Sequence, residues 1–453
     1  MSWRTRFRCR MFLRSSLCVP AIVSMAAALL AAPLIRLADD RMQWTLMGFG
    51  LEGSRLVVGA LASSLLTFIV FAFSIILLLV QVAGGQLTPR IIARIFETRL
   101  TRQTVSAFVF SYVYSLAALG RIEERVPQLP VLIAVLSSLL SVALFLSLIQ
   151  TAGRNVRPIM ILTRVGDDTR NVIQALYPEP FSPHRKGQSP SDFPVAPAHR
   201  TVVYGGPSGT VLAFHAVQLA DYARRADGRI VLLPQVGDFL ATGEELFQLY
   251  GDFTGIASDE DLICCVALGT ERILDHDPAF GFRILVDIAS KALSPAINDP
   301  TTAALVIDQL HPLLHLLAGR ELDSGVIRDS SGRVRLAYRV PGWEDYVALA
   351  VTEIRTYGAG NPQVTRRLQA LFEKLLPIVP EARAAALRQE QALLQRTINR
   401  SFAEEEDRTI AGTADWQGFG SRPFPSTREK GSPTLPSTSN HSSMTEPKER
   451  ELI

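Results

Sequence analysis

A line of polar side chains on one predicted helix suggests a site for an anion. Arg283, Asp287 and Lys291 are four residues apart, so they share one face of a helix that begins near residue 278. Ser294 extends this line by three residues, and the neighbouring positions are apolar. The structural alternative is a ladder of exposed ion pairs, each stabilising the helix by roughly a few tenths of a kcal/mol.

The segment SPAINDPTT, residues 294–302, leads from this helix into the next one. Asp299 and Pro300 form the expected N-cap and first-turn pair. Free backbone N–H groups and the positive end of the helix dipole attract anions here, although Asp299 is itself an anion that can satisfy this end. A structural and a ligand-binding role therefore both remain open. The predicted ligand-binding residues are Arg272, Arg283, Asp287, Lys291, Ser294, Asn298, Asp299, Thr301 and Thr302.

Two histidine-containing clusters have the residue types of a metal site, but a structural role explains each of them better. In the sequence DHD at 275–277, Asp277 precedes a proline and fits a helix N-cap. His311 and His315 share a helix face among leucines, which is typical of a core or surface pair. No catalytic triad order, phosphate-binding glycine loop or cysteine nucleophile stands out. We expect no catalytic residue, no metal and no cofactor.

Four apolar stretches precede residue 155, and each is close to the roughly 20 residues that cross the hydrocarbon layer. They cover about residues 17–38, 56–83, 103–120 and 130–150; the third is short and carries several hydroxyl groups. The sequence therefore predicts a membrane α-helical bundle of four transmembrane helices. Cleavage of the first stretch as a signal peptide is the alternative, and it would leave three spans.

Arginine is distributed unevenly around these stretches, which predicts their orientation. The tail before the first stretch carries five arginines, and the connections after the second and fourth are also arginine-rich. The other two connections mix fewer arginines with acids. We expect a multi-pass protein of the bacterial inner (plasma) membrane with both termini in the cytoplasm.

One of these connections predicts a helix along the cytoplasmic membrane surface. Thr88 and Pro89 fit a helix start, and Arg90 and Arg94 lie on one face of the helix that follows. These two arginines either contact lipid phosphates or only enforce orientation. The predicted spans contain no Asp, Glu, Lys or His, which weighs against an ion-coupled transporter. Their small residues suit close packing inside the bundle or between subunits of a homo-oligomer.

A cytoplasmic α+β region is expected to follow the membrane domain of residues 1–165. Residues 166–200, rich in Pro and Ser, predict a linker, and 201–253 predict a small β-rich module. The sequence VGDFLATGEELFQL in that module resembles the half-barrel of biotinyl/lipoyl-like domains, which implies a small structural barrel because no Lys is present for attachment. Residues 254–405 predict a helical domain, and 406–453 a disordered tail.

The net charge and the cysteine pattern narrow the classes of binding partner that we expect. A net charge of +3 without a polybasic block gives no indication of nucleic acid. The four cysteines show neither CxxC spacing nor a Cys/His metal pattern, so a disulfide framework is not expected. The expected partners are the lipid bilayer and an anionic small molecule or lipid headgroup.

Several quoted segments together resemble a known family. QLTPR, GTERILDHDPAFGFRILVDIASKALSPAINDPTTA and EIRTYGAGNPQV, with four N-terminal spans, look like the bacterial predicted membrane proteins called domain of unknown function 2254. The resemblance implies an inner-membrane protein with a cytoplasmic C-terminal region and no assigned reaction. We therefore expect a non-enzymatic ligand-sensing or ligand-binding module coupled to a membrane bundle. The alternatives are a channel or transporter and, third, a membrane-bound enzyme.

Overall fold

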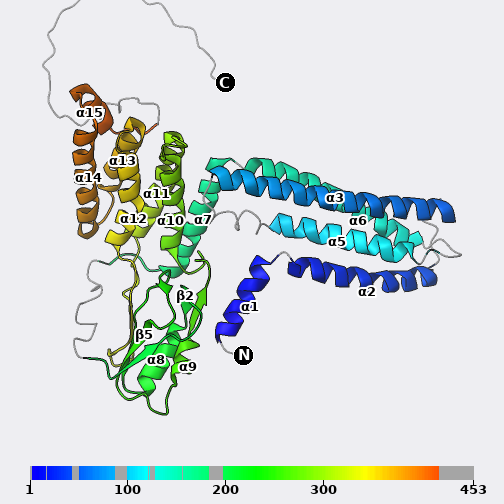
Figure 1. Cartoon of the computed structure of the whole chain (residues 1–453), viewed down its shortest axis with the longest axis horizontal. Helices are drawn as coiled ribbons and strands as arrows, with labels where there is room; N and C mark the ends of the chain where they lie inside the picture. The colour runs from blue at the N-terminus through cyan, green and yellow to red at the C-terminus, as the bar shows by residue number, and fades with distance from the viewer. Residues whose placement is uncertain are drawn as a thin grey trace, which may run out of the picture.

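A bundle of long helices lies beside a mixed helical and β-sheet region in the computed structural model (Figure 1). The described residues are 3–16, 18–42, 50–86, 99–120, 122, 128–155, 157–182 and 197–417. The helix predicted to carry Arg90 and Arg94 lies outside these residues, so nothing here tests its membrane-surface role. A short N-terminal helix, α1 (Trp3–Ser15), lies between the bundle and the β-sheet region.

Three helices of the bundle are long and apolar enough to cross a membrane. They are α2 (Cys18–Met42), α3 (Leu51–Gln86) and α6 (Gln128–Asn155), with candidate spans Cys18–Arg41, Leu51–Leu78 and Gln128–Thr151. Three of the four predicted spans are thereby confirmed by length and composition. The third predicted span lies in α5 (Arg99–Leu119), whose hydroxyl-bearing residues keep it less apolar than the other helices.

Helix α5 packs inside the bundle beside α2, α3 and α6. Its buried face carries hydroxyl groups and aromatic rings rather than a continuous apolar surface. The Ser111 hydroxyl on α5 lies 2.9 Å from the Ser141 hydroxyl on α6, and both side chains are buried. The Phe108 ring lies 6.0 Å from the Phe145 ring, edge to face. Small and hydroxyl-bearing residues therefore mediate close helix packing, as the sequence predicted.

Two sheets form the β-sheet region. The five-stranded sheet has the order β1–β5–β3–β8–β7, and the three-stranded sheet has the order β4–β2–β6. All neighbours are antiparallel except β3 and β8, which are parallel. The strands are β1 (Arg200–Val203), β2 (Gly209–Phe214), β3 (Arg229–Leu232), β4 (Phe239–Leu240), β5 (Glu245–Tyr250), β6 (Val266–Gly269), β7 (Val326–Arg328) and β8 (Val334–Tyr338). The short helices α8 (Ala216–Arg225) and α9 (Asp259–Ile263) accompany them.

The β strands extend beyond the range that the sequence pattern assigned to them. Strands β6, β7 and β8 all come from the range 254–405, which the pattern predicted to be a helical domain. Strand β8 pairs with β3 across about a hundred residues, so its place in the sheet depends on a contact that local periodicity does not report. The described strands form two separate hydrogen-bonded sheets, and the predicted barrel-like closure is not confirmed.

Helices α7 and α10 to α15 share one hydrophobic core. They are α7 (Pro158–Leu176), α10 (Pro278–Ala292), α11 (Pro300–Ala318), α12 (Trp343–Tyr357), α13 (Pro362–Leu375), α14 (Glu381–Ser401) and α15 (Glu405–Gly412). Asp277 accepts a hydrogen bond from Phe280 N at the start of α10, and Asp299 accepts one from Thr302 N at the start of α11. The two Asp-Pro caps read from the sequence are confirmed.

Two predicted boundaries differ from the structure. Residues 166–176, assigned to a linker, belong to α7, which buries Val165 and Ile173 against α10 and α11 because its apolar residues recur at helical spacing. The tail assigned to disorder from residue 406 instead continues through α15 to residue 417. There the buried Asp415 carboxylate lies 3.2 Å from the Arg366 guanidinium. Residues 418–453 lie outside the described part of the chain.

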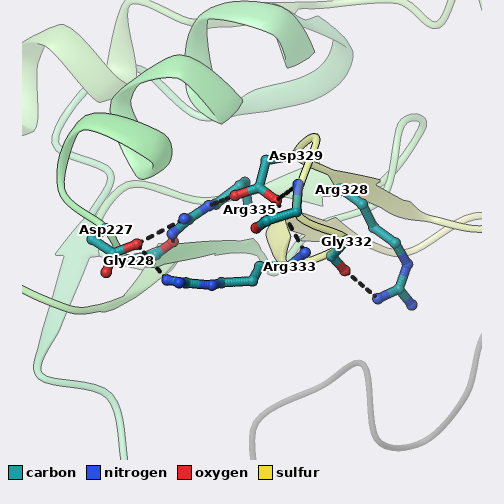
Figure 2. Close-up of polar contacts among 8 residues, drawn as sticks. Asp227, Gly228, Arg328, Asp329, Gly332, Arg333 and Arg335 are labelled. Atoms are coloured by element: carbon teal, nitrogen blue, oxygen red, sulfur yellow. Dashed lines mark hydrogen bonds and ion pairs between the residues drawn. The ribbon is translucent and has the colours of Figure 1, made fainter.

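A buried arginine fixes the β7–β8 hairpin to the turn before β3 (Figure 2). The Arg335 side chain is 6% exposed and donates to Asp329 Oδ2 and Asp227 Oδ1, both at 2.7 Å, and to Gly228 O at 3.1 Å. Asp329 also accepts from Ser331 Oγ at 2.6 Å within the hairpin turn. These bonds hold β8 in register beside β3, and β8 leads directly into the site described below.

Replacing Asp329 with asparagine is expected to remove an acid-sensitive part of the stability. The Ser331 hydroxyl and the Arg335 guanidinium hold the pKa of the Asp329 carboxyl well below its usual range. Because this pKa is lower in the folded chain than in the unfolded chain, the carboxylate stabilises the fold above about pH 4, and this contribution is lost as the pH falls further. The difference in thermal midpoint between wild type and Asp329→Asn should be largest near neutral pH and shrink toward about pH 3. A difference independent of pH contradicts this.

Candidate ligand-binding site

The polar stripe on α10 is occupied by cross-helix ion pairing. Arg283 Nε donates to Asp287 Oδ1 at 2.8 Å, and Arg283 Nη1 donates to Glu353 Oε1 at 2.7 Å. Arg283 Nη2 completes a bidentate contact with Glu353 on α12. This contact holds the pKa of the Glu353 carboxyl below its usual range. Glu353 was missed in the sequence because it lies 70 residues from its partner.

The turn between α10 and α11 is satisfied by its own side chains. Asp299 accepts from Thr302 N at 3.1 Å and from Thr302 Oγ1 at 2.5 Å, so its carboxylate occupies the helix start. Ser294 Oγ donates to Lys291 O at 2.7 Å. Asn298 has a φ of +49°, a left-handed conformation that Asn tolerates better than most residues. Thr301 is exposed at the first turn of α11.

Arg272 lies at the opposite end of α10 from the other predicted site residues. It pairs with Asp277, the N-cap of α10, and its guanidinium lies 5.5 Å from the Phe280 ring centre. Lys291 is 14 residues after Asp277, which places the two helix ends about 20 Å apart. The structure therefore brings together Arg283 with Asp287, and Asp299 with Thr302, but it does not bring Arg272 to the same place.

A cavity of about 420 Å³ lies on the Arg272 side of α10, where the helical and β-sheet regions meet. It falls within the roughly 300–1,000 Å³ range of small-molecule sites, which occur preferentially at domain interfaces. Several separate parts of the chain form its walls, among them α1, the end of α7, β2, the start of α10 and the segment after β8. We call it the interdomain pocket. Its lining includes Trp3, Phe7, Arg10, Leu176, Tyr177, Phe214, Gln235, His276, Asp277, Asp323, Tyr338, Arg339, Val340 and Tyr346.

Aromatic rings form much of the wall of the interdomain pocket. The Trp3 ring on α1 meets the His215 ring edge to face at 5.3 Å. The Phe214 ring on β2 lies 4.9 Å from the Tyr338 ring on β8, also edge to face. Rings held by packing give flat apolar walls that lose little entropy when a ligand binds. The pocket is therefore suited to a flat ligand body.

Three tyrosine hydroxyls supply neutral hydrogen-bonding groups. Tyr177 and Tyr346 hydroxyls lie 3.3 Å apart, and Tyr338 donates to Asp323 Oδ2 at 2.8 Å. Burial raises the pKa of all three phenols, so they stay protonated at neutral pH. Among the described residues the Tyr177–Tyr346 pair has no further hydrogen-bonding partner. One of its two hydroxyl hydrogens is therefore available to a ligand.

Two arginine side chains that line the pocket are available to bind a ligand. The Asp277 carboxylate is used by Phe280 N and Arg272, and Asp323 is used by Tyr338. The exposed guanidinium groups of Arg10 and Arg339 line the same cavity, and within the described part of the chain neither has a hydrogen-bonding or ion-pairing partner. A ligand with an anionic group would therefore complement these two guanidinium groups.

The pocket was largely invisible in the sequence. Only Asp277 and His276 drew attention there, as candidates for a cap and for metal ligation, and the structure commits Asp277 to capping. No three His, Cys, Asp or Glu side chains of the described ranges gather in a way that could hold a metal. The aromatic residues come from segments more than three hundred residues apart, so no local spacing indicates them.

Both chain connections between the bundle and the rest of the molecule contribute to this pocket. Helix α1 ends at Ser15 and α2 begins at Cys18; α6 ends at Asn155 and α7 begins at Pro158. Helix α1 supplies Trp3, Phe7 and Arg10, and the end of α7 supplies Leu176 and Tyr177. A ligand in the pocket would therefore touch both segments that lead into the membrane bundle.

Comparisons with known proteins identify the family to which this chain is similar. The family profile described as predicted membrane protein (DUF2254) matches residues 14–374. An uncharacterized protein of Mycobacterium tuberculosis (strain CDC 1551 / Oshkosh) is 30% identical over 370 residues, which is 79% of this chain and 70% of the relative. An uncharacterized protein of Mycobacterium bovis matches with the same identity and coverage. No solved structure matches the chain significantly.

Proposed function

We propose that this chain, which belongs to the DUF2254 family of predicted membrane proteins, senses a small aromatic anion in its interdomain pocket and transmits the bound state to the membrane bundle. The observation that carries the proposal is that α1 and α7, the two connections to the bundle, both line that pocket. Aromatic walls, a phenol donor and two available guanidinium groups match a flat body with a carboxylate or similar anion.

The transmission follows from where the ligand contacts lie. A ligand shifts a conformational equilibrium only by its difference in affinity between the two states. Trp3, Phe7 and Arg10 can contact the ligand only while α1 is docked on the β-sheet region. Binding therefore favours the docked position of α1, and α1 is separated from the first membrane helix by two residues.

The same observation supports four membrane crossings. With an odd number of crossings, α1 and α7 would lie on opposite sides of the bilayer, yet both line one pocket. An even number requires α5 to be the fourth crossing. Its hydroxyl groups are compatible with this because they are buried against neighbouring helices rather than exposed to lipid.

The orientation in the membrane is the final part of the proposal. The arginine-rich segments before α2 and after α6 would lie on the same side of the bilayer as the pocket. Short connections rich in arginine remain in the cytoplasm. We therefore place the pocket and both termini in the cytoplasm of a bacterial inner membrane. A periplasmic signal from a C-terminal topology reporter contradicts this orientation.

Binding of a defined aromatic anion tests the pocket. The full-length protein in phosphatidylcholine nanodiscs is titrated with naphthalene-2-carboxylate and, as the uncharged match, naphthalene-2-carboxamide. The carboxylate should raise the thermal midpoint and slow hydrogen exchange in α1, while the amide should do so weakly. Arg339→Gln should weaken carboxylate binding by roughly tenfold to a hundredfold, because one charge-assisted contact is worth about 1.5–3 kcal/mol.

The matched control for this prediction is Arg328→Gln. Arg328 is an exposed arginine of the same hairpin, but it does not line the pocket. It should bind the carboxylate as the wild type does. Equal binding of carboxylate and amide, or equal loss in both variants, contradicts the proposed anion site.

A further inference from the structure

A second cavity, of about 410 Å³, lies on the neighbouring face of α1. It is bounded by α1, by the loop before β2 and by the end of β6, the edge strand of the three-stranded sheet. We call it the α1 cavity. Trp3 and Phe7 face the interdomain pocket, whereas Arg4 and Arg8 face this second cavity. Helix α1 therefore separates two sites with different linings.

The α1 cavity is cationic. Arg4 and Arg8 are four residues apart and so lie one turn apart on the same face of α1. Arg4 Nε is buried and has no hydrogen-bonding partner, and neither arginine has an ion-pairing partner among the described residues. Within the described ranges of the chain, the lining contains no Asp or Glu. A buried unpartnered guanidinium nitrogen beside a second arginine is well matched by an acceptor with several oxygens.

The rest of the lining divides into a polar and an apolar part. Ser208 and Thr270 supply hydroxyl groups at the loop before β2 and after β6. Met11 and Phe12, on the part of α1 nearest the membrane helices, join Leu212 and Leu268 in an apolar wall. A ligand with an anionic head and an apolar remainder fits both parts.

The position of α1 relative to the bundle points to the source of such a ligand. Figure 1 shows α1 running across the direction of α2, α3 and α6, from the start of α2 toward the β-sheet region. The candidate span begins at Cys18, three residues after α1 ends. Phe12 and Leu13 are 62% and 50% exposed, which leaves apolar surface at the membrane end of α1.

We propose that the α1 cavity binds a phosphate group, with Arg4 and Arg8 as the phosphate contacts, and that an anionic phospholipid of the surrounding membrane supplies it. The acyl chains would lie along Phe12 and the exposed apolar end of α1. Arginine forms bidentate contacts with phosphate oxygens, which a zwitterionic headgroup with its own cation satisfies less well. Bound lipid would hold α1 against the edge of β6.

Lipid binding to matched arginine variants tests this proposal. Phosphatidylglycerol is titrated into the full-length protein in neutral detergent, and bound lipid is measured by native mass spectrometry, with phosphatidylcholine as the zwitterionic comparison. Arg4→Gln and Arg8→Gln should each weaken phosphatidylglycerol binding about tenfold, the equivalent of one charge-assisted contact. Arg6→Gln removes the same charge from an exposed position of α1 outside the cavity and should leave binding unchanged.

A second arm identifies the source of the phosphate. Inorganic phosphate is added as a competitor, and circular dichroism confirms that each variant keeps its helix content. Phosphatidylglycerol that is retained against inorganic phosphate supports the lipid source. Full displacement by inorganic phosphate supports the phosphate site and assigns it to a soluble anion instead. Equal weakening by Arg6→Gln, or equal affinity for phosphatidylcholine, overturns the proposal.

Discussion

An Arg383→Leu variant is expected to lose roughly 2–4 kcal/mol of stability. Arg383 is 8% exposed and donates from Nη1 to Leu317 O at 2.6 Å and to Ala318 O at 3.0 Å, which are among the last carbonyls of α11. Leucine offers no donor, so these helix-end carbonyls would remain buried without this partner. Burial lowers the pKa of Arg383, yet the guanidinium stays charged at neutral pH because its ordinary pKa is so high.

Aromatic contacts add to the expected loss. The Arg383 guanidinium lies 4.2 Å from the Phe181 ring centre and 5.6 Å from that of Trp343. The Trp343 indole also donates to Arg383 O at 2.8 Å, so this residue joins α12, α14 and the end of α11. Cation–π contacts of partly desolvated arginines are worth about 0.5–2 kcal/mol each.

The thermal midpoint of the full-length protein in detergent measures this effect. A loss of this size should lower the midpoint by roughly 5–10 °C. Arg388→Leu is the control on the same helix. In the described part of the chain Arg388 pairs only with Glu381, at an exposed position, so this variant should leave the midpoint nearly unchanged. Equal shifts of the thermal midpoint in both variants would contradict a stabilising contribution from the buried helix-end contacts.

A Gly281→Ala variant is expected to lose roughly 1–3 kcal/mol by overpacking the contact between α7 and α10. A Cβ atom at residue 281 would overlap Thr169 Oγ1 and lie 2.7 Å from Thr169 Cγ2 and 2.9 Å from Leu274 Cδ1. Thr169 is fully buried, and its hydroxyl already donates to Val165 O within α7. The buried Thr169 side chain has little room to move, so we expect the added methyl group to push α7 away from α10.

A second substitution makes this prediction specific. Thr169→Ala removes both overlapping atoms, so the double variant Gly281→Ala with Thr169→Ala should recover most of the lost thermal midpoint. Gly59→Ala in α3 is the control, because a Cβ atom there meets nothing within 4 Å. Additive losses in the double variant contradict close packing as the cause. Since α7 follows the last membrane helix, the proposed transmission between the interdomain pocket and the bundle would pass through this contact.

The sequence by itself determined the features that depend on neighbouring residues. Apolar stretches of membrane length are confirmed in α2, α3 and α6, because crossing a bilayer requires about 20 consecutive apolar residues. The caps at Asp277 and Asp299 are confirmed because an Asp-Pro pair satisfies a helix start through residues only three positions away. Family membership was also readable, since its motifs are continuous in the chain.

The predicted anion site shows what the spacing of residues along one helix can predict and what it cannot. The stripe on α10 was correct as a helix face, but the partner of Arg283 is Glu353 on another helix. Spacing along one helix predicts which residues share a face, but it does not predict which element packs against that face. The same limit hid the role of Arg272, which lies at the far end of α10 from Lys291.

Only the tertiary structure decided where the two cavities lie. The interdomain pocket joins Phe7, near the start of the chain, to Tyr346, and strand β8 reaches it because Arg335 fixes its hairpin beside β3. More than three hundred residues separate these segments in the chain, so no window of sequence encodes the contact. The composition of the chain specified a membrane bundle and a folded partner region; the packing of that region against α1 and α7 specified where a ligand can act on both.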